Sequence, residues 1–364
     1  MELILSDEQQ LLNESAEKFF ARLGGVKRAR ELRNSKAGFD RDGLRKIAEN
    51  GWLGMLVPEA HGGQALGPSE LALVMQQAGR ALAPEPIGAT ALAALMISES
   101  NDAAIRDGLL RTLVAGETVV IPALQDLSGG VELTETSMKA VRRGGEWRLT
   151  GGKGFVLYAG ACDGFLVSAR DEDGLVICHV PRTTSGLEIR LSPTVEGRTY
   201  GTLTFNDVPS TQAVARGNVA SASLQRYHGL ALVAAAAEML GAMEGVIALT
   251  LEYLKTRKQF GRAIGSFQAL QHRVVDNYVL IESTRSLLHQ ICQGGEPIAP
   301  SMASALKAVA SGAALKVGKA AVQLHGAIGF TDEYDVGLYL KRAMWLSSYL
   351  GNESAHQRRY ARLS

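Results

Sequence analysis

One segment of the sequence combines a guanidinium, two aromatic rings and glycines within a few residues of one another. It reads RKQFGRAIGSFQALQH, from Arg257 to His272, where one long helical pattern ends and the next begins. Arg257 carries a permanent charge and a planar fork of N–H donors that suit a pyrophosphate. Phe260 and Phe267 could wall a ligand, and Gly261 allows a tight turn. A helix corner with a solvated arginine has the same composition, so spacing alone leaves both interpretations open.

A second segment, QLHGAIGFTDEY, runs from Gln323 to Tyr334. The Gln323 amide can both donate and accept hydrogen bonds, while Gly326 and Gly329 would let the main chain approach a ligand closely. His325 lies between them, and its ring could contact a ligand or simply pack. A helix end that contains glycine produces the same pattern, so this segment indicates a binding site only together with other segments.

Composition excludes several classes of function. The 38 lysines and arginines nearly balance 37 aspartates and glutamates, so no global field draws the chain to nucleic acid or to an anionic membrane. Three widely spaced cysteines and seven histidines without H-x-x-x-H spacing predict no disulfide framework and no metal site. The cysteine usage and the absence of a secretory signal indicate a cytoplasmic protein. Two glutamates interrupt the most apolar stretch, residues 230–251, which favours a core helix over a membrane span.

The elements expected around these segments fall into three regions. Residues 1–117 show helical periodicity, broken by prolines and paired glycines. Residues 118–215 contain short apolar runs and alternating patterns, which predict a β-domain. Residues 216–364 return to helical periodicity, in four long pieces. The order is therefore all-α, then β, then an α-bundle.

Paired glycines make finer predictions within these regions. Turns are expected at Gly144-Gly145 and at Gly151-Gly152, between strands of the β-domain. Gly241 and Gly245 lie one turn apart in an alanine-rich helix, where the missing side chains would let another helix approach closely.

Taken in this order, the segments closely resemble the acyl-CoA dehydrogenase family. VPEAHGG, at residues 57–63, matches an N-terminal loop of that family, and LTFNDVP, at residues 203–209, matches the last strand of its β-domain. RKQFGRAIGSFQ and QLHGAIGF match two C-terminal signatures. The resemblance covers nearly the whole chain. It implies an α+β fold with an N-terminal helical domain, a central β-barrel-like domain and a C-terminal four-helix bundle, assembled as a dimer of dimers with FAD at a dimer interface.

The resemblance also implies a reaction and a set of binding residues. Members of the family remove hydrogens from Cα and Cβ of an acyl-CoA thioester. A carboxylate takes the α-proton, flavin N5 accepts the β-hydride, and the electrons leave through an acceptor such as an electron-transfer flavoprotein. The flavin ring would lie in the neighbouring subunit. The residues implied to hold the pyrophosphate and adenine end of the FAD are Arg257, Gln259, Phe260, Phe267, Gln268, Gln323, Gly326 and Gly329.

The sequence departs from the family at the catalytic base. Most members carry a glutamate followed by glycine a helix length after the second signature, and counting places Leu350 and Gly351 there. A minority takes the base from the helix before the first signature, where Ala231 stands. Neither side chain can move a proton, so no catalytic residue is predicted. Glu353, about one helical turn beyond Leu350, is the remaining candidate for a displaced base, or a solvated carboxylate on a helix face.

The β-domain departs as well. The family's T-E-P-x-x-G-S-D loop, which contacts flavin and substrate, is not recognisable after Ile121, where the chain reads PALQDLSGGVELTET. The W-I-T/S segment that packs on the flavin corresponds to Phe155-Val156-Leu157, without the hydroxyl. The residues that serve a neighbour's flavin are therefore kept, whereas those that serve the chain's own centre are altered.

This asymmetry predicts a division of labour between unlike subunits. The family includes two-chain members that degrade steroid side chains and dicarboxylic acids, and this chain resembles their less catalytic partner. An α2β2 assembly with a catalytic paralogue is expected. Two alternatives remain open: a structural or regulatory subunit without a cofactor, and a flavin-dependent monooxygenase on the same fold.

Overall fold

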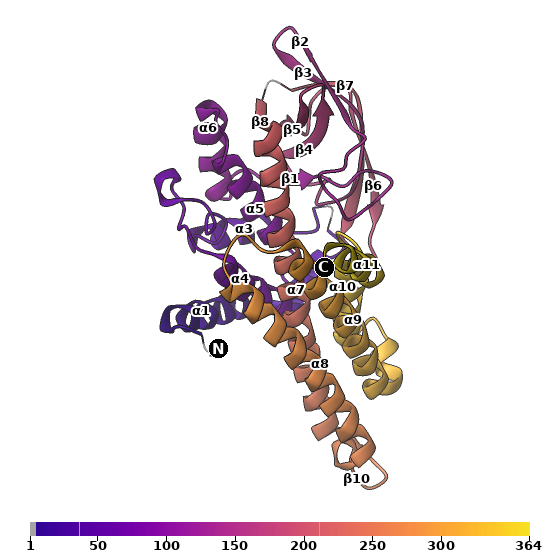
Figure 1. The fold of residues 1–364 in the computed structure, drawn as a ribbon. Coiled ribbons are helices and arrows are strands. Elements are labelled where there is room, and N and C mark those ends of the chain that lie inside the picture. The colour runs from indigo at the N-terminus through magenta and orange to yellow at the C-terminus, as the bar shows by residue number, and fades with distance from the viewer. Residues whose placement is uncertain (1–4, 36, 211) are drawn as a thin grey trace. The chain divides into compact units, whose positions relative to one another are not determined.

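The computed structural model describes residues 5–35, 37–210 and 212–364 (Figure 1). Within these residues the chain forms two compact units. The first contains residues 5–31, 68–83 and 232–364, and the second contains residues 32–67 and 84–231, apart from the two undescribed positions.

The first unit is helical. Its opening helix begins with a capping box, in which Ser6 accepts from the Gln9 main chain and Gln9 reaches back to Ser6. Five α-helices, one more than the predicted four, follow residue 216, and all five lie in the described part of the chain. The helices that lie wholly or mostly in this unit are α1 (Asp7–Leu23), α2 (Gly25–Leu32), α4 (Pro68–Arg80), α7 (Gly217–Thr256), α8 (Gln268–Gln293), α9 (Pro300–His325), α10 (Val336–Ser348) and α11 (Glu353–Leu363).

Glycines let two helices pack closely on α7, as the sequence predicts. A Cβ at Gly241 would lie 1.8 Å from the Gln76 carbonyl oxygen of α4, and a Cβ at Gly79 would lie 2.1 Å from the Glu238 carbonyl oxygen. The two helix backbones therefore touch at this crossing. Gly245 leaves room for the Tyr339 ring of α10.

Helix α7 is long and apolar enough, by length and composition, to cross a membrane. However, 83% of its most apolar stretch is buried inside the protein. Two of its three glutamates form buried or half-buried ion pairs, Glu238 with Arg342 and Glu244 with Arg285, each at 2.6 Å. Burial among other helices and paired charges are the features of a core helix, in agreement with the sequence.

The second unit is built on an eight-stranded sheet. The strand order is β6-β7-β3-β2-β4-β5-β8, and β1 pairs parallel with β4. The buried helix α5 (Ile87–Ser98) contacts β1 and α6 (Ala103–Val114), and α3 (Arg41–Glu49) precedes them. The strands are β1 (Val120–Ala123), β2 (Lys139–Arg143), β3 (Glu146–Leu157), β4 (Gly164–Asp171), β5 (Gly174–Pro181), β6 (Leu187–Pro193), β7 (Thr199–Ser210) and β8 (Gln212–Arg216).

One of the two predicted glycine turns is wrong. Gly144-Gly145 does join β2 to β3, with positive φ at both residues. Gly151-Gly152 instead lies inside β3, at an irregularity in its pairing with β7. A Cβ at Gly152 would lie 2.5 Å from the Leu127 side chain. These glycines thus let a distant loop cross the strand, and a contact of this kind is invisible in local sequence.

Candidate functional site

The first signature segment forms a tight hairpin between α7 and α8. Strands β9 (Lys258–Gln259) and β10 (Arg262–Ala263) pair antiparallel, which leaves Phe260 and Gly261 as a two-residue turn. Their φ angles are 51° and 79°, the positive values that a type I′ turn needs. Phenylalanine is strained in this region of φ, and its side chain is 90% exposed. Folding gains little from this ring, because most of its surface contacts no other part of the described chain.

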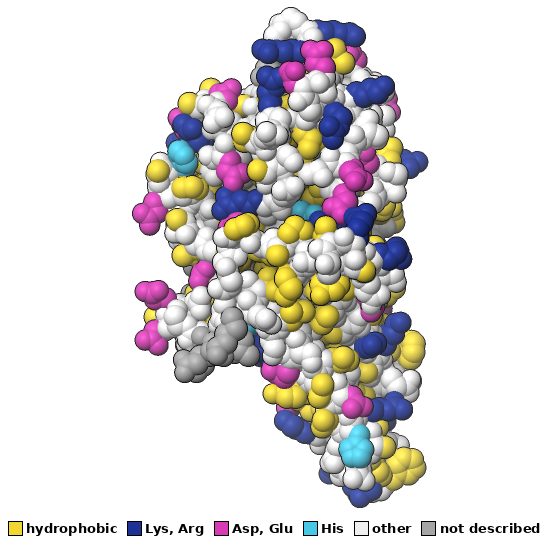
Figure 2. All heavy atoms as spheres, viewed as in Figure 1, with side chains coloured by type: hydrophobic (Ala, Val, Ile, Leu, Met, Phe, Trp, Pro, Cys, Tyr) yellow, Lys and Arg dark blue, Asp and Glu magenta, His cyan; other side chains and the backbone are white. Residues whose placement is uncertain are grey.

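Cations and aromatic rings surround this turn. The Arg262 guanidinium lies 4.1 Å from the centroid of the Phe267 ring, and that ring meets Phe260 edge-on at 6.1 Å. Within the described ranges, no side chain bonds to the exposed Arg257 guanidinium. Figure 2 shows hydrophobic, basic and histidine side chains together around the position of β10. The predicted residues Gln259 and Gln268 are exposed beside them.

The second signature segment ends α9 and continues into η3, a 3-10 helix at Gly326–Phe330. Gln323 is exposed on the last turn of α9. Gly326, with φ 65°, has open space where a Cβ would stand, whereas a Cβ at Gly329 would lie 2.5 Å from the Val322 carbonyl oxygen. Gly326 therefore leaves room for a ligand, while Gly329 lets η3 fold back on its own helix.

An aromatic cluster that the sequence did not reveal links the two segments. His325, at the end of α9, stacks on Tyr253 of α7 with ring centroids 4.5 Å apart, and Tyr334 lies 5.0 Å from the histidine. Tyr253 stands four residues before Arg257 in the sequence, so the two signatures meet in the first unit. His325 is buried and bonds through Nδ1 to the Ala321 carbonyl at 2.8 Å.

The physical role of His325 follows from this setting. Burial lowers the pKa of its imidazole, and the hydrogen bond with Ala321 only partly offsets that effect. The ring packs against two tyrosines, Tyr253 and Tyr334, which also contact each other, and it is shielded from solvent. Of the two interpretations that the sequence left open, the geometry favours packing.

The turn after α10 contains Leu350, the residue that counting along the sequence predicts at the position of the family's glutamate. Leu350 is 3% exposed and has φ 57°, another strained left-handed conformation. The buried Lys307 ammonium donates to the carbonyl oxygens of Gly351, at 2.8 Å, and of Ser347, at 3.3 Å. His356 bonds to the Leu350 carbonyl at 3.0 Å. The turn is thus firmly held, yet its central side chain is an alkyl group. Ala231, the second position considered for a base, is buried in α7.

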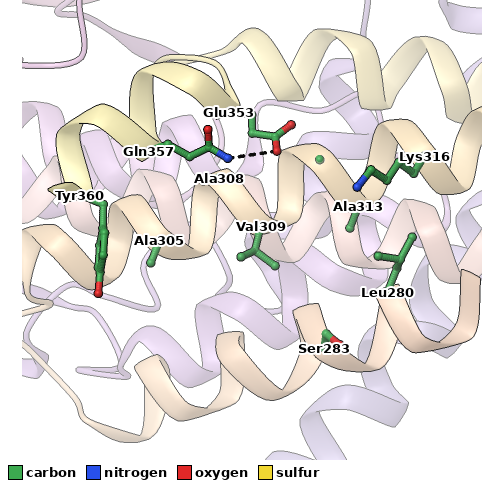
Figure 3. Close-up of a pocket in the computed structure, with 11 residues that line it drawn as sticks. Leu280, Ser283, Ala305, Ala308, Val309, Ala313, Lys316, Glu353, Gln357 and Tyr360 are labelled. Atoms are coloured by element: carbon green, nitrogen blue, oxygen red, sulfur yellow. Dashed lines mark hydrogen bonds between the residues drawn. The ribbon is translucent and has the colours of Figure 1, made fainter. Parts of the chain in front are cut away.

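Glu353 lies elsewhere, in a groove of about 390 Å³ between α8, α9 and α11. Its carboxylate faces the groove beside Gln357, whose amide donates to it at 3.3 Å (Figure 3). The carboxylate also rests against Gly312, where a Cβ would lie 2.9 Å from it. Lys316 lines the same groove. In the described part of the chain, no group of three or more His, Cys, Asp or Glu side chains could hold a metal ion.

Phe155, in the segment that corresponds to W-I-T/S, has φ 58° and is 43% exposed. Its ring stacks on Tyr200 of β7, with an interplanar angle of 16° and centroids 6.2 Å apart. The second unit therefore presents a flat aromatic surface, although Leu157 carries no hydroxyl.

Comparisons with known proteins agree with these features. Two family models match, for the N-terminal domain of acyl-CoA dehydrogenases over residues 6–117 and for the C-terminal domain over residues 231–363. The acyl-CoA dehydrogenase IpdE2 of Mycolicibacterium smegmatis is 30% identical over 362 residues, 98% of each chain. This chain belongs to the acyl-CoA dehydrogenase family.

Two solved structures share its fold over nearly the whole length. A steroid acyl-CoA dehydrogenase described as a Tcur3481–Tcur3483 variant has a TM-score of 0.89 and 32% identity, and the match covers 98% of this chain and 97% of that one. The ChsE4–ChsE5 complex of Mycobacterium tuberculosis has a TM-score of 0.90 and 27% identity, over 100% and 98% of the two chains. Both are described as pairs of unlike chains. The predicted acyl-CoA dehydrogenase fold is thereby confirmed.

Proposed function

We propose that this chain is one subunit of an FAD-dependent acyl-CoA dehydrogenase and that it binds the pyrophosphate and adenine end of a flavin whose ring lies in a neighbouring subunit. The single observation that carries the proposal is the strained, exposed Phe260 turn, bordered by cations and joined to the second signature by the Tyr253–His325 stack. A strained aromatic at the surface is a feature of binding sites.

The residues present fit a dinucleotide. An FAD tail offers two phosphates and a flat purine, which require cations, amides and aromatic faces. Arg257 and Gln323 are exposed with their donors available, and Gly326 leaves the main chain uncovered. When bound, FAD would supply the acceptor for the substrate hydride. The proposed tail-binding set is Arg257, Gln259, Phe260, Phe267, Gln268, Gln323, Gly326 and Gly329.

The same chain offers no general base at either position that the family uses. Leu350 and Ala231 cannot accept the α-proton of a thioester. We therefore propose a composite enzyme in which a catalytic paralogue supplies the base, the acyl-CoA pocket and the contact with an electron-transfer flavoprotein-like acceptor. The two-chain descriptions of the steroid acyl-CoA dehydrogenase and of the ChsE4–ChsE5 complex, both similar in structure to this chain, support this arrangement. The three-domain division at residues 1–117, 118–215 and 216–364 belongs to the same proposal.

An exposed apolar face supports association with another subunit. Val275, Tyr278 and Val279 of α8 are each more than half exposed, and the groove that contains Glu353 opens between α8, α9 and α11. Apolar side chains of this size are usually covered in an assembly. We propose a dimer of dimers of the α2β2 type.

Co-expression with a neighbouring dehydrogenase gene product tests the proposal. We expect this subunit, purified alone, to carry half an FAD or less per chain. The heteromer should be yellow and fully loaded with FAD. Arg257→Met should reduce the flavin absorbance per heteromer at least about tenfold, a loss of roughly 1.4 kcal/mol or more in binding. Arg358→Met, which removes an exposed arginine of α11, is the matched control. A colourless heteromer of normal stability would show that the chain is a structural subunit instead.

A further inference from the structure

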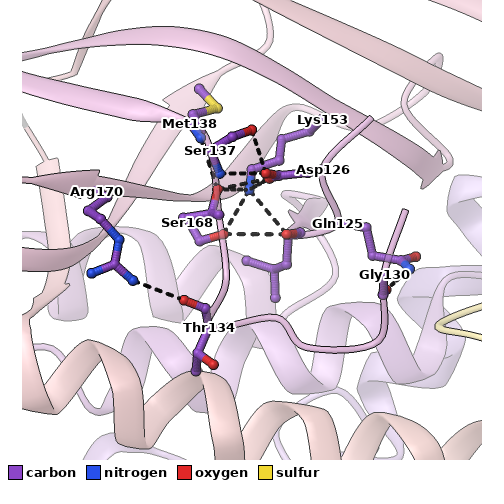
Figure 4. Close-up of polar contacts among 11 residues, drawn as sticks. Gln125, Asp126, Gly130, Thr134, Ser137, Met138, Lys153, Ser168 and Arg170 are labelled. Carbon is purple, nitrogen blue, oxygen red and sulfur yellow. Dashed lines mark hydrogen bonds and ion pairs between the residues drawn. The ribbon is translucent and has the colours of Figure 1, made fainter. Parts of the chain in front are cut away.

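A buried ion pair joins strand β3 to the loop that precedes β2. The Lys153 side chain is 0% exposed, and its Nζ lies 2.7 Å from Oδ1 of Asp126. The two residues also form an isolated antiparallel bridge. Figure 4 shows the ammonium at the centre of a ring of oxygen atoms.

The partners of this pair come from both ends of the same loop. Lys153 donates to the Leu124 carbonyl at 3.1 Å and to the Thr136 hydroxyl at 3.0 Å. Asp126 accepts from the main chain and the hydroxyl of Ser137, at 2.6 and 2.7 Å. The pair therefore closes the neck of the loop, residues 127–135. Outside the loop, Lys153 donates to Ser168 of β4 at 3.0 Å.

Electrostatics favours the closed neck. Burial alone would raise the pKa of Asp126, but the hydrogen bonds from Lys153 and from the Ser137 main chain outweigh it and lower the pKa to about 2. Burial also lowers the pKa of Lys153, against the opposing effect of Asp126. Breaking one partner leaves the other buried without its counter-charge, which is strongly unfavourable.

The closed loop lies directly against the segment around Phe155. The Gly154 amide donates to the Gln125 carbonyl at 2.9 Å, and a Cβ at Gly129 would come within 4.0 Å of the Phe155 ring. Leu127, which crosses β3 at Gly152, is 52% exposed. The loop and the aromatic ring thus share one exposed apolar surface.

We propose that Lys153 and Asp126 are positioning residues, which fix the loop of residues 127–135 beside Phe155 and so set the shape of this surface. That the surface then faces a bound ring or acyl chain rests on the proposed function, whereas the positioning itself does not. Strands β3 and β4 keep their own ladders without the pair. Loss of the pair therefore releases the loop before it unfolds the sheet.

Hydrogen exchange of the purified chain, without flavin or partner, tests this inference. In Asp126→Asn, a neutral residue of the same shape replaces the carboxylate. We expect exchange of amides in residues 124–138 to accelerate at least about tenfold, with less than about twofold change in β4 and β5. Thr136→Val, which removes one hydroxyl from the ring, should show a smaller effect in the same segment. Lys139→Met, which removes an exposed lysine of β2, is the control.

Two results would overturn the inference. Unchanged exchange in residues 124–138 of both variants would show that the pair does not hold the loop. Equal acceleration in the loop and in β4 and β5 would show that the pair only adds to global stability. Because the chain is tested without flavin, neither result depends on whether Arg257 binds FAD, and a failure of the FAD proposal would leave the exchange pattern as expected.

Discussion

Replacement of Phe260 should make the protein more stable while weakening its proposed function. The residue occupies a left-handed turn position with φ 51°. A non-glycine residue in this conformation costs roughly 1–3 kcal/mol, and asparagine is among the residues that tolerate it best. Phe260→Asn should relieve most of that strain.

The packing that the substitution removes is small. The side chain is 90% exposed, so only the remaining 10% is covered. For an aromatic side chain this amounts to about 20 Å², or roughly 0.5 kcal/mol of burial. The edge contact with Phe267 at 6.1 Å contributes about another 0.5 kcal/mol. Relief of strain should exceed these losses, and we expect a net gain of about 1 kcal/mol in the free energy of unfolding.

Urea unfolding of the isolated chain at fixed concentration measures this gain. The matched control is Phe330→Asn, because Phe330 is 81% exposed but does not have a positive φ. The Phe330→Asn variant should show no gain in the free energy of unfolding. If Phe260→Asn proves no more stable than Phe330→Asn, the strain argument is wrong. In the heteromer, Phe260→Asn should also lower the flavin content, as expected if the strained ring is kept for binding.

Three further predictions concern Lys307, Gly241 and Leu350. The pKa of Lys307 is lowered by burial to about 7 from an ordinary value of 10.5. Between these pH values the unfolded chain keeps a proton that the folded chain has lost. The free energy of unfolding of the wild type, relative to that of Lys307→Met, should therefore rise with pH by up to about 1.4 kcal/mol per pH unit. Urea unfolding that shows the same difference between the two proteins at every pH would contradict this. Gly241→Ala places a Cβ 1.8 Å from the Gln76 carbonyl oxygen and should destabilise the chain by about 3 kcal/mol or more. In the control Gly108→Ala, nothing lies within 4 Å of the new Cβ, so this change should be neutral or stabilising. Thermal unfolding of both variants measures the difference. Leu350→Glu alone should not restore full dehydrogenase activity, because the Phe155–Leu157 segment is altered as well; measurable turnover on several acyl-CoAs would refute that interpretation of the β-domain.

The sequence by itself determined the order of the elements and the signature segments. Helical and strand periodicities reflect residues that are neighbours along the chain, and these neighbours largely set local conformation. The hairpin at Gly144-Gly145 and the close approach at Gly241 followed from residue type alone. The same reasoning failed at Gly151-Gly152, where the strand continues instead of turning. There the missing side chain of Gly152 leaves room for Leu127, a residue from outside the strand.

Only the tertiary structure decided which distant groups meet. Lys153 and Asp126 are 27 positions apart, and no local pattern marks them as partners. The stack of Tyr253 on His325, the burial of Lys307 beneath the turn at Leu350 and the strain at Phe260 likewise became visible only in the folded chain. The physical reason is that such contacts depend on how whole elements pack against one another. Close packing brings together residues that lie far apart in the sequence, and no local sequence pattern marks them as neighbours.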